Sequence, residues 1–412
     1  MKKKWISLLL VTLLCLSGCG SAVPANTTDF TSVPGNASNT KTTSSAQASE
    51  EYRAMWISYL ELKSFAGMDE VTFRQSAAQM LQNCVDMGLN TVVVQVRPFG
   101  DALYNSQIFP QSHIVATEQG NPIGYDPLLI FIEEGHARNL KVEAWVNPYR
   151  IQLSSTQPAT LSAQNPAVLH PEWTLQANGG LYYDPALPEV RQLVVDGVKE
   201  IVSNYDVDGI HFDDYFYPTT DEAFDRDSYA KFANGMPLDE WRRNNVNLLI
   251  QQVYKTIKEI KPNVRFGISP QGNNGNNYNQ QYSDVCLWLK EPGYVDYIMP
   301  QLYWGFDYLT SSQRTDYQFA GLSKQWADYP RHESVQLYIG LGAWRIGDGD
   351  GGSNEQTEWS SGTNLAKMVE TLRQAGCDGF ALYRYDSLYS SAYPELAAAE
   401  RAALSNLLNP AV

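Results

Sequence analysis

The stretch Asp208-Gly-Ile-His-Phe-Asp-Asp-Tyr-Phe-Tyr-Pro218 joins a short apolar run to two carboxylates, a group of aromatic residues and a proline. It predicts a β-strand over Gly209–Tyr217, because aromatic and β-branched residues dominate a run that ends at a proline. Helical periodicity lies on both sides, over Pro188–Tyr205 and Leu238–Ile260. A strand between two helices indicates the α/β class, in which helices cover a parallel sheet.

The same alternation of strands and helices repeats along the chain after Glu51. The predicted strands are Arg53–Leu60, Thr91–Pro98, Lys141–Tyr149, Gly209–Tyr217, Arg265–Pro270, Val295–Trp304, Val335–Trp344 and Gly379–Tyr385. The predicted helices are Val71–Met87, Pro127–Asn139, Pro188–Tyr205, Leu238–Ile260, Tyr282–Leu289, Gln313–Ala327 and Asn364–Ala375. Eight strands separated by seven helices predict a (β/α)₈ TIM barrel. The alternative, a doubly wound open sheet, usually has fewer strands and a glycine-rich phosphate loop after the first one, and the sequence has no such loop.

The first residues have the pattern of an export signal. Three lysines at 2–4 precede an apolar run from Trp5 to Leu16, which is shorter than a membrane span. The ending Leu16-Ser-Gly-Cys19 resembles a bacterial lipobox, which implies cleavage before Cys19 and a lipid on its sulfur. The alternative is an ordinary signal peptide with a chance cysteine. We therefore predict a lipoprotein signal peptide over 1–18, a Ser/Thr/Asn-rich disordered tether over 19–50 and the barrel over 51–410.

The amino-acid composition indicates which class of molecule the protein binds. A net charge of −15 and an isoelectric point near 4.8 argue against nucleic acid, because a polyanion would be repelled. The 25 tyrosines and 10 tryptophans favour a carbohydrate, because flat aromatic faces pack against the C–H faces of sugars. The five histidines lack the spacing of a metal site, and no cofactor motif is apparent. The predicted partners are thus a polysaccharide and, through the lipid, a membrane.

In a barrel of this type the active site lies at the C-terminal ends of the strands. Asp213 and Asp214 follow the fourth strand and are the predicted catalytic pair, because glycosidic cleavage needs a carboxylate near the anomeric carbon and an acid near the leaving oxygen. Alternation along a strand puts these two side chains on opposite faces, so both reach a substrate only if the strand ends between them. Asp101 and Asp386 remain alternatives for the second carboxylate.

The other strand ends carry amides, carboxylates, arginines and aromatic residues, a mixture that suits sugar hydroxyls and ring faces. The predicted substrate-binding residues are Arg97, Asp101, Asn147, Tyr149, Arg150, His211, Tyr215, Gln301, Tyr303, Trp304, Trp344, Arg384 and Asp386. Each arginine among them could clamp a substrate carboxylate or hold a catalytic aspartate ionised. Glu143 lies deeper in the third strand, and we predict a structural role in which it pairs with His211 or an arginine.

Five of the strand segments together carry a family resemblance. They are Arg53-Ala-Met-Trp-Ile57, Val94-Gln-Val-Arg-Pro98, Ala144-Trp-Val-Asn-Pro-Tyr-Arg150, Asp208-Gly-Ile-His-Phe-Asp-Asp-Tyr-Phe-Tyr-Pro218 and Met299-Pro-Gln-Leu-Tyr-Trp304. Over about Glu51 to Leu388 the chain resembles glycosyl-hydrolase-like family 10, whose members are bacterial extracytoplasmic proteins and often lipoproteins. The resemblance implies a barrel that acts on a glycan such as that of the bacterial cell wall, with the family's fourth-strand acids at Asp213 and Asp214. The chain departs from the family after the fifth strand, where Gln271-Gly-Asn-Asn-Gly-Asn-Asn277 replaces an aromatic residue and an arginine.

Three functions remain open from the sequence. The first is hydrolysis of internal glycosidic bonds in a polysaccharide by Asp213 and a second carboxylate. The second is a non-catalytic glycan-binding lipoprotein on a barrel scaffold, which buried salt bridges at the carboxylates would favour. The third is a metal-dependent deacetylase, which the histidine spacing disfavours.

Overall fold

The computed structural model describes residues 50–154, 157–158, 160–354 and 357–410. The predicted signal peptide, Cys19 and the predicted tether up to residue 49 lie outside the described residues. Within the described part of the chain, no helix is both long and apolar enough to cross a membrane.

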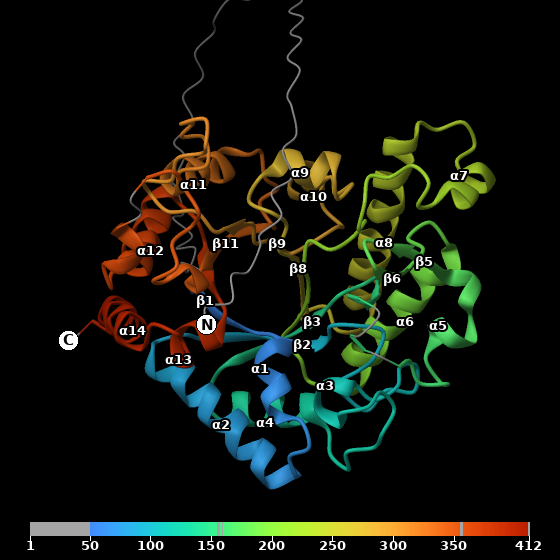
Figure 1. Ribbon diagram of the computed structural model, residues 1–412, viewed down its shortest axis with the longest axis horizontal. Helices are drawn as coiled ribbons and strands as arrows, with labels where there is room; N and C mark the ends of the chain where they lie inside the picture. The colour runs from blue at the N-terminus through green and yellow to red at the C-terminus, as the bar shows by residue number, and fades with distance from the viewer. Residues whose placement is uncertain (1–49, 155–156, 159, 355–356, 411–412) are drawn as a thin grey trace, which may run out of the picture. The chain divides into compact units, whose positions relative to one another are not determined.

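Nine strand segments form one closed parallel sheet, which confirms the predicted (β/α)₈ barrel (Figure 1). The segments are β1 (Tyr52–Ile57), β2 (Thr91–Arg97), β3 (Lys141–Val146), β7 (Gly209–Phe212), β8 (Arg265–Ile268), β9 (Tyr297–Ile298), β10 (Gln301–Leu302), β11 (Gln336–Gly342) and β12 (Gly379–Tyr383). The short segments β9 and β10 are two parts of the sixth barrel strand, interrupted at Pro300, whose nitrogen cannot donate to a neighbouring strand. Pairing of β12 with β1, in the register Tyr52↔Gly379, closes the barrel.

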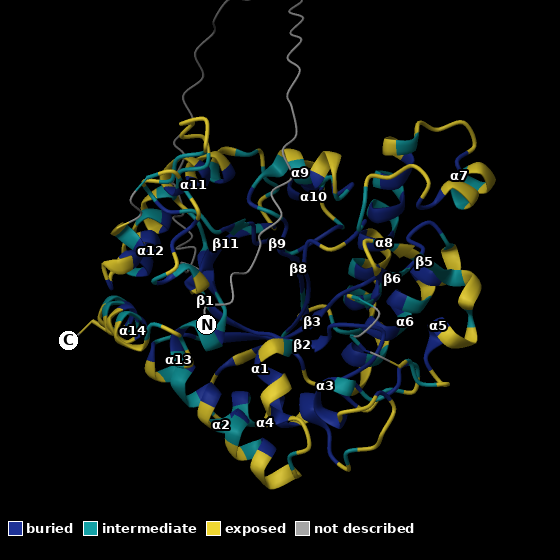
Figure 2. Ribbon diagram, viewed as in Figure 1, coloured by how far each residue is buried: buried dark blue, intermediate teal, exposed yellow. Residues whose placement is uncertain are grey.

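The strands are mostly apolar because each is buried on both sides. Every residue of β2 is buried, and its sequence TVVVQVR is almost continuously apolar. The main hydrophobic core lies between the strands and the surrounding helices. A smaller cluster, rich in aromatic residues and including Trp56, Trp145, Tyr297 and Tyr338, fills the barrel interior. Figure 2 shows the buried strands at the centre and the exposed faces of the outer helices.

Eight of the described helices lie outside the barrel, and seven of them overlap predicted helices. They are α2 (Glu70–Asp86), α4 (Pro127–His136), α6 (Pro188–Asn204), α8 (Leu238–Ile260), α10 (Val285–Lys290), α11 (Phe319–Asp328), α12 (Asn364–Ala375) and α14 (Pro394–Leu408). Asp69, Asp126 and Asp284 begin α2, α4 and α10 by accepting a backbone N–H with their side chains. The sequence reasoning missed α14, which follows the last strand and completes the outer ring.

All eight predicted strands end before the expected residue, and the early ends of the third and the fourth shape the site. The third ends at Val146, before Pro148, and Arg150 begins β4 (Arg150–Gln152) of a separate antiparallel sheet with β5 (Thr174–Ala177) and β6 (Gly180–Tyr183). The fourth ends at Phe212 rather than Tyr217.

The remaining short helices are α1 (Tyr59–Leu62), η1 (Lys63–Phe65), α3 (His113–Ala116), α5 (Pro166–Leu169), η2 (Pro171–Trp173), α7 (Arg226–Phe232), α9 (Asn274–Asn279), η3 (Ala343–Arg345), η4 (Thr357–Ser360) and α13 (Tyr385–Tyr389).

Candidate active site

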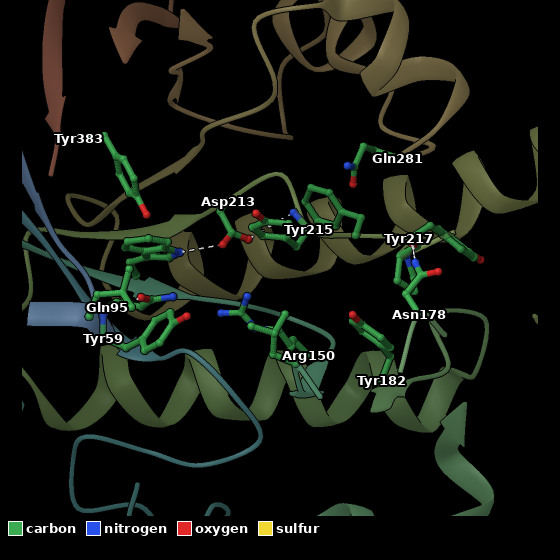
Figure 3. Close-up of a pocket in the computed structure, with 15 residues that line it drawn as sticks. Tyr59, Gln95, Arg150, Asn178, Tyr182, Asp213, Tyr215, Tyr217, Gln281 and Tyr383 are labelled. Carbon is green, nitrogen blue, oxygen red and sulfur yellow. Dashed lines mark hydrogen bonds between the residues drawn. The ribbon is translucent and has the colours of Figure 1, made fainter. Parts of the chain in front are cut away.

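Two adjoining hollows open at the C-terminal ends of the barrel strands. The first, which we call the main hollow, has a volume of about 350 Å³. The second, the inner hollow, has a volume of about 150 Å³. Both are lined by Trp145, Asp213, Tyr215 and Tyr383, so Asp213 stands at their junction. Figure 3 shows the polar ends of Tyr59, Arg150 and Tyr383 directed toward the space beside Asp213.

The early end of β7 places both aspartates in this site. Because the strand stops at Phe212, the chain turns, and the backbone N–H of Phe216 donates to the carbonyl of Asp214 over 3.1 Å. Asp214 therefore lines the inner hollow together with Asp213. The sequence required a strand that ends between the two aspartates, whereas β7 ends one residue earlier, before both, and both side chains line the inner hollow.

Three donors hold the carboxylate of Asp213. Asn147 Nδ2 and, over 3.2 Å, Trp145 Nε1 both donate to Oδ2, while the backbone N–H of Tyr215 donates to Oδ1 over 3.3 Å. An indole N–H can only donate, so Oδ2 accepts from two groups at once. A proton on Asp213 therefore lies on Oδ1.

The amide of Asn147 is itself oriented by a relay of hydrogen bonds. Gln95 Nε2 donates to Asn147 Oδ1 over 2.6 Å, and Gln95 Oε1 accepts the backbone N–H of Tyr59 over 2.9 Å. Because Tyr59 supplies a backbone donor, the direction of each bond in the relay is fixed. The relay thus presents the NH₂ group of Asn147, and not its oxygen, to Asp213.

Burial raises the pKa of both aspartates above the ordinary range. For Asp213 burial is the main cause, and the negative charge of Asp214 adds to it. For Asp214 burial is again the main cause, partly offset by hydrogen bonds that include one of 3.1 Å from Gln301 Nε2 to Oδ1. Two adjacent buried carboxylates resist simultaneous ionisation, so the pair retains a proton at a pH where ordinary aspartates have lost theirs.

Arg150 is the cation that acts on this pair, because its positive charge lowers the pKa of each aspartate. Its Nε donates to the carbonyl of Pro98 over 2.9 Å, and its Cζ lies 4.8 Å from the ring centroid of Phe99 and 5.5 Å from that of Tyr215. Within the described part of the chain, Arg150 has no carboxylate within 4.0 Å. Asp213 and Asp214 likewise form no ion pair with any described residue.

The structure brings many of the predicted residues together. Those that line the main or inner hollow are Arg150, Asp213, Asp214, Tyr215, Gln301, Tyr303 and Trp344. Asn147 is buried behind them and holds Asp213. Arg384 and Asp386 line a third hollow that also touches Trp344.

Other predicted substrate-binding residues are buried away from the hollows. Arg97, Asp101 and Tyr149 are each at most 2% exposed and line none of them. The ladder between β2 and β3 shifts register between Gln95 and Arg97, and the guanidinium of Arg97 lies 4.5 Å from the ring centroid of Phe109. The expected substrate contact of Arg97 is therefore wrong, because the irregularity turns the side chain into the core. Asp101 instead accepts from the side chains of His113 and Gln119, which ties the loop after β2 to the core.

Trp304 also lies outside the hollows. Its ring centroid is 5.0 Å from that of Tyr317 and 6.2 Å from that of Tyr308. Tyr303, its neighbour, lines the inner hollow, so consecutive side chains after β10 point to different sides. Trp304 is half-buried and packs against these two tyrosines, and its contact with substrate stays a prediction.

His211 is completely buried inside the barrel, beneath the site. Trp56 Nε1 donates to its Nε2 over 3.3 Å, so the proton lies on Nδ1 and is donated over 2.9 Å to the hydroxyl of Tyr297, which in turn donates to Glu143. Burial lowers the pKa of His211 to about 3, so the imidazole stays neutral. This confirms the structural role of Glu143, although its link to His211 runs through Tyr297. It corrects the expectation that His211 contacts substrate.

Sequence reasoning missed several residues that line the hollows. Tyr383 and Trp145 face both of them, and Tyr59, Gln95, Tyr182 and Gln281 line the main hollow. Two of these residues could have been predicted from the sequence. Gln95 is a lone amide in an apolar strand, and Trp145 lies two residues before Asn147 and hence on the same face of its strand. Tyr182 and Gln281 come from insertions between barrel elements, where the sequence had no periodicity to place them.

Comparisons with known proteins found a matching family model and similar bacterial proteins. The family model glycosyl hydrolase-like 10 matches residues 51–361. Glycosyl hydrolase YngK of Bacillus subtilis (strain 168) is 36% identical over 352 residues, which cover 80% of this chain and 67% of that protein. Glycosyl hydrolase DigH of Escherichia coli (strain K12) is 33% identical over 402 residues, which cover 89% of this chain and 88% of that protein.

Solved structures share the fold at low sequence identity. The glycoside hydrolase domain of PgaB (BpsB) from Bordetella bronchiseptica aligns with a TM-score of 0.60 at 13% identity, over 88% of this chain and 100% of that one. The catalytic domain of β-amylase from Paenibacillus polymyxa aligns with a TM-score of 0.53 at 11% identity, over 87% of this chain and 99% of that one. These likenesses support the barrel fold alone.

Proposed function

The chain belongs to the glycosyl hydrolase-like 10 family, and from this premise we propose that it hydrolyses internal glycosidic bonds of a polysaccharide with Asp213 and Asp214. The observation that carries the proposal is the buried carboxylate pair, which lines a hollow and has no ion-pair partner among the described residues. Two carboxylates that keep one proton between them supply both groups that the reaction needs, an acid and a negative charge.

The chemistry follows from these two groups. The protonated carboxyl gives its proton to the glycosidic oxygen as the bond between that oxygen and the anomeric carbon breaks. The ionised carboxylate stabilises the positive charge that develops on the sugar ring, or attacks it, and water finally supplies a hydroxyl to the carbon and a proton to the protein. Arg150 favours the ionised form of the pair, and the aromatic faces of Tyr215, Tyr303 and Trp344 offer stacking surfaces beside it.

The alternative, a glycan-binding protein without activity, is disfavoured by the same pair. Burial that raises the pKa of a carboxyl costs folding free energy, and a structural aspartate would normally recover that cost through an arginine or lysine. Asp225, elsewhere in the barrel, does so with a fully buried ion pair to Arg242, whose Nη2 is 2.6 Å from Oδ1. Glu143 is also buried without an ion pair to any described residue, but it is a single carboxylate away from the hollows, whereas two adjacent carboxylates at a hollow favour catalysis.

Reducing-end detection after incubation with a panel of polysaccharides tests the proposal. We expect new reducing ends from a bacterial cell-wall glycan, because the proposed lipid anchor on Cys19 would hold the protein outside the cytoplasm, where this polymer is the nearest polysaccharide. Internal cleavage should shorten the polymer quickly while few small products appear. Binding of a glycan with no new reducing ends from any member of the panel would favour the non-catalytic alternative.

We propose further that the lipid on Cys19 anchors the protein in the cell membrane. Cys19→Ala removes the sulfur that would carry it, so the variant should leave the membrane fraction and remain soluble without detergent. The matched control is Cys15→Ala, which changes a cysteine inside the apolar run and should leave the protein in the membrane fraction. Unchanged membrane retention of Cys19→Ala would contradict the lipobox.

A further inference from the structure

A third hollow, which we call the distal hollow, shares the side chain of Trp344 with the inner hollow. Its volume is about 320 Å³, and it lies between η3 and α13, which follow β11 and β12 at the same end of the barrel as the carboxylates. Asp213 lines both the main and the inner hollow, so the carboxylate pair lies between the main hollow and Trp344.

Trp344 is an exposed side chain that lines both hollows, and its ring is held in place by neighbouring residues. Its side chain is 38% exposed, although it is large and apolar. The guanidinium carbon of Arg345 lies 3.6 Å from its ring centroid, and Arg345 Nε donates to the carbonyl of Tyr303 over 3.2 Å. The arginine thus supports one face of the indole, and a ring fixed in this way is suited to stacking on a sugar.

The charge of the distal hollow excludes an anionic ligand. Asp348 and Asp386 line it, and its one arginine, Arg384, already pairs with the buried Glu61 over 2.5 Å and with Asp386 over 3.2 Å. Tyr393 donates to Asp348 Oδ1 over 2.7 Å. Within the described part of the chain, no group donates to the second oxygen of either aspartate, so each can accept a hydrogen bond from a sugar hydroxyl.

We propose that the distal hollow is a non-catalytic subsite, which binds a sugar unit without a carboxylate in the same polysaccharide chain that is cleaved at Asp213. The unit stacks on Trp344 and donates hydroxyls to Asp348 and Asp386. This inference rests on the proposed function, because it assigns the distal hollow to the same substrate. Long chains, which reach this subsite, are therefore bound better than short ones.

Ser390 offers a way to fill the subsite without touching the carboxylate pair. It lines the distal hollow and is exposed at the end of α13, so a larger side chain there is accommodated by the fold. In Ser390→Phe, kcat/KM for a long chain of the glycan that the panel identifies should fall about tenfold, which corresponds to about 1.4 kcal/mol. The value for a trisaccharide of the same glycan should change less, so the preference for long chains should shrink.

Ser334→Phe is the matched control, because Ser334 is an exposed serine that precedes β11 at the opposite end of the barrel. It should keep the wild-type preference. Asp348→Ala is a second variant that removes a proposed hydroxyl acceptor without adding bulk, and it should reduce the preference in the same direction. A wild-type ratio of long-chain to trisaccharide kcat/KM in both Ser390→Phe and Asp348→Ala would overturn the subsite.

Failure of the proposed function gives a different result. If wild-type protein cleaves neither substrate, the catalytic proposal fails, and the Kd for the long chain then decides the subsite by itself. Weaker binding by Ser390→Phe and Asp348→Ala than by wild type or Ser334→Phe would support it. Equal Kd values for all four proteins would overturn it.

Discussion

Asp213→Asn should lower kcat by roughly 10³-fold or more while the protein still folds and binds its glycan. The substitution keeps the shape of the side chain and removes its charge and its acidic proton. Both are needed at the junction of the main and inner hollows, where the bond to be cleaved would lie. Reducing-end release measures the rate, and sedimentation with insoluble glycan measures binding. A folded variant that cleaves at the wild-type rate would show that Asp213 is not catalytic.

The same variant should gain stability at neutral pH. Because burial raises the pKa of Asp213 in the folded protein above its unfolded value, the native state binds more protons than the unfolded state, and stability falls as pH rises through the window between the two values. An asparagine does not titrate and so escapes this loss. Each unit of pKa shift corresponds to about 1.4 kcal/mol, so the gain should be at least of that order at neutral pH and vanish near pH 4. Thermal unfolding at several pH values measures it, and a large loss of stability would indicate a structural aspartate.

Asp214→Asn completes the test of the pair. A loss of kcat comparable to that of Asp213→Asn would identify Asp214 as the second catalytic carboxylate. A much smaller loss would make it a positioning residue and would move the second role to Asp386. The other alternative that the sequence left, Asp101, is fully buried and held by His113 and Gln119, so it cannot reach a substrate.

The fold was predictable because long periodic segments determine it. α8 and α12 begin and end at the predicted residues, since 23 and 12 residues with one apolar face leave little choice of register. The sheet of β4, β5 and β6 was not predicted, because its strands have only three or four residues each and their exposure does not alternate. This small sheet carries Arg150 and Tyr182 to the main hollow; Arg150 was predicted as a binding residue, whereas Tyr182 was missed together with the sheet.

Site residues could be predicted where the side chains at a strand end line the hollows. They could not be predicted where an irregularity in the strand turns a side chain into the core. Asp213 and Asp214 directly follow β7 and Gln301 begins β10, and all three line the inner hollow as predicted. Arg97 also ends a strand, but the irregularity in the ladder after Gln95 sends it into the core. A sequence pattern identifies which residues lie at the end of a strand, whereas a register shift of one residue decides which face they occupy.

Asn147→Leu should lower kcat by about 10²–10³-fold, the usual cost of removing one oriented donor from a catalytic charge. Leucine has nearly the same shape but cannot donate to Asp213 Oδ2 or accept from Gln95, so it breaks the relay at its last bond. Loss of a donor to the ionised carboxylate raises the pKa of Asp213 further. The acidic limb of the pH–rate profile, where the pair lacks its ionised member, should therefore move to higher pH.

Gln95→Met tests whether the relay, and not only the last donor, matters. It leaves Asn147 in place but frees its amide to turn, so kcat should fall less than in Asn147→Leu, while the acidic limb moves in the same direction. Asn364→Leu replaces another buried asparagine that lies outside the hollows, at the start of α12, and should leave the profile unchanged. If Asn147→Leu lost stability but kept the wild-type pH–rate profile, Asn147 would support the fold without positioning Asp213. A shifted profile with a normal melting temperature would locate its effect at the carboxylate pair, which is what a relay starting from the backbone of Tyr59 implies.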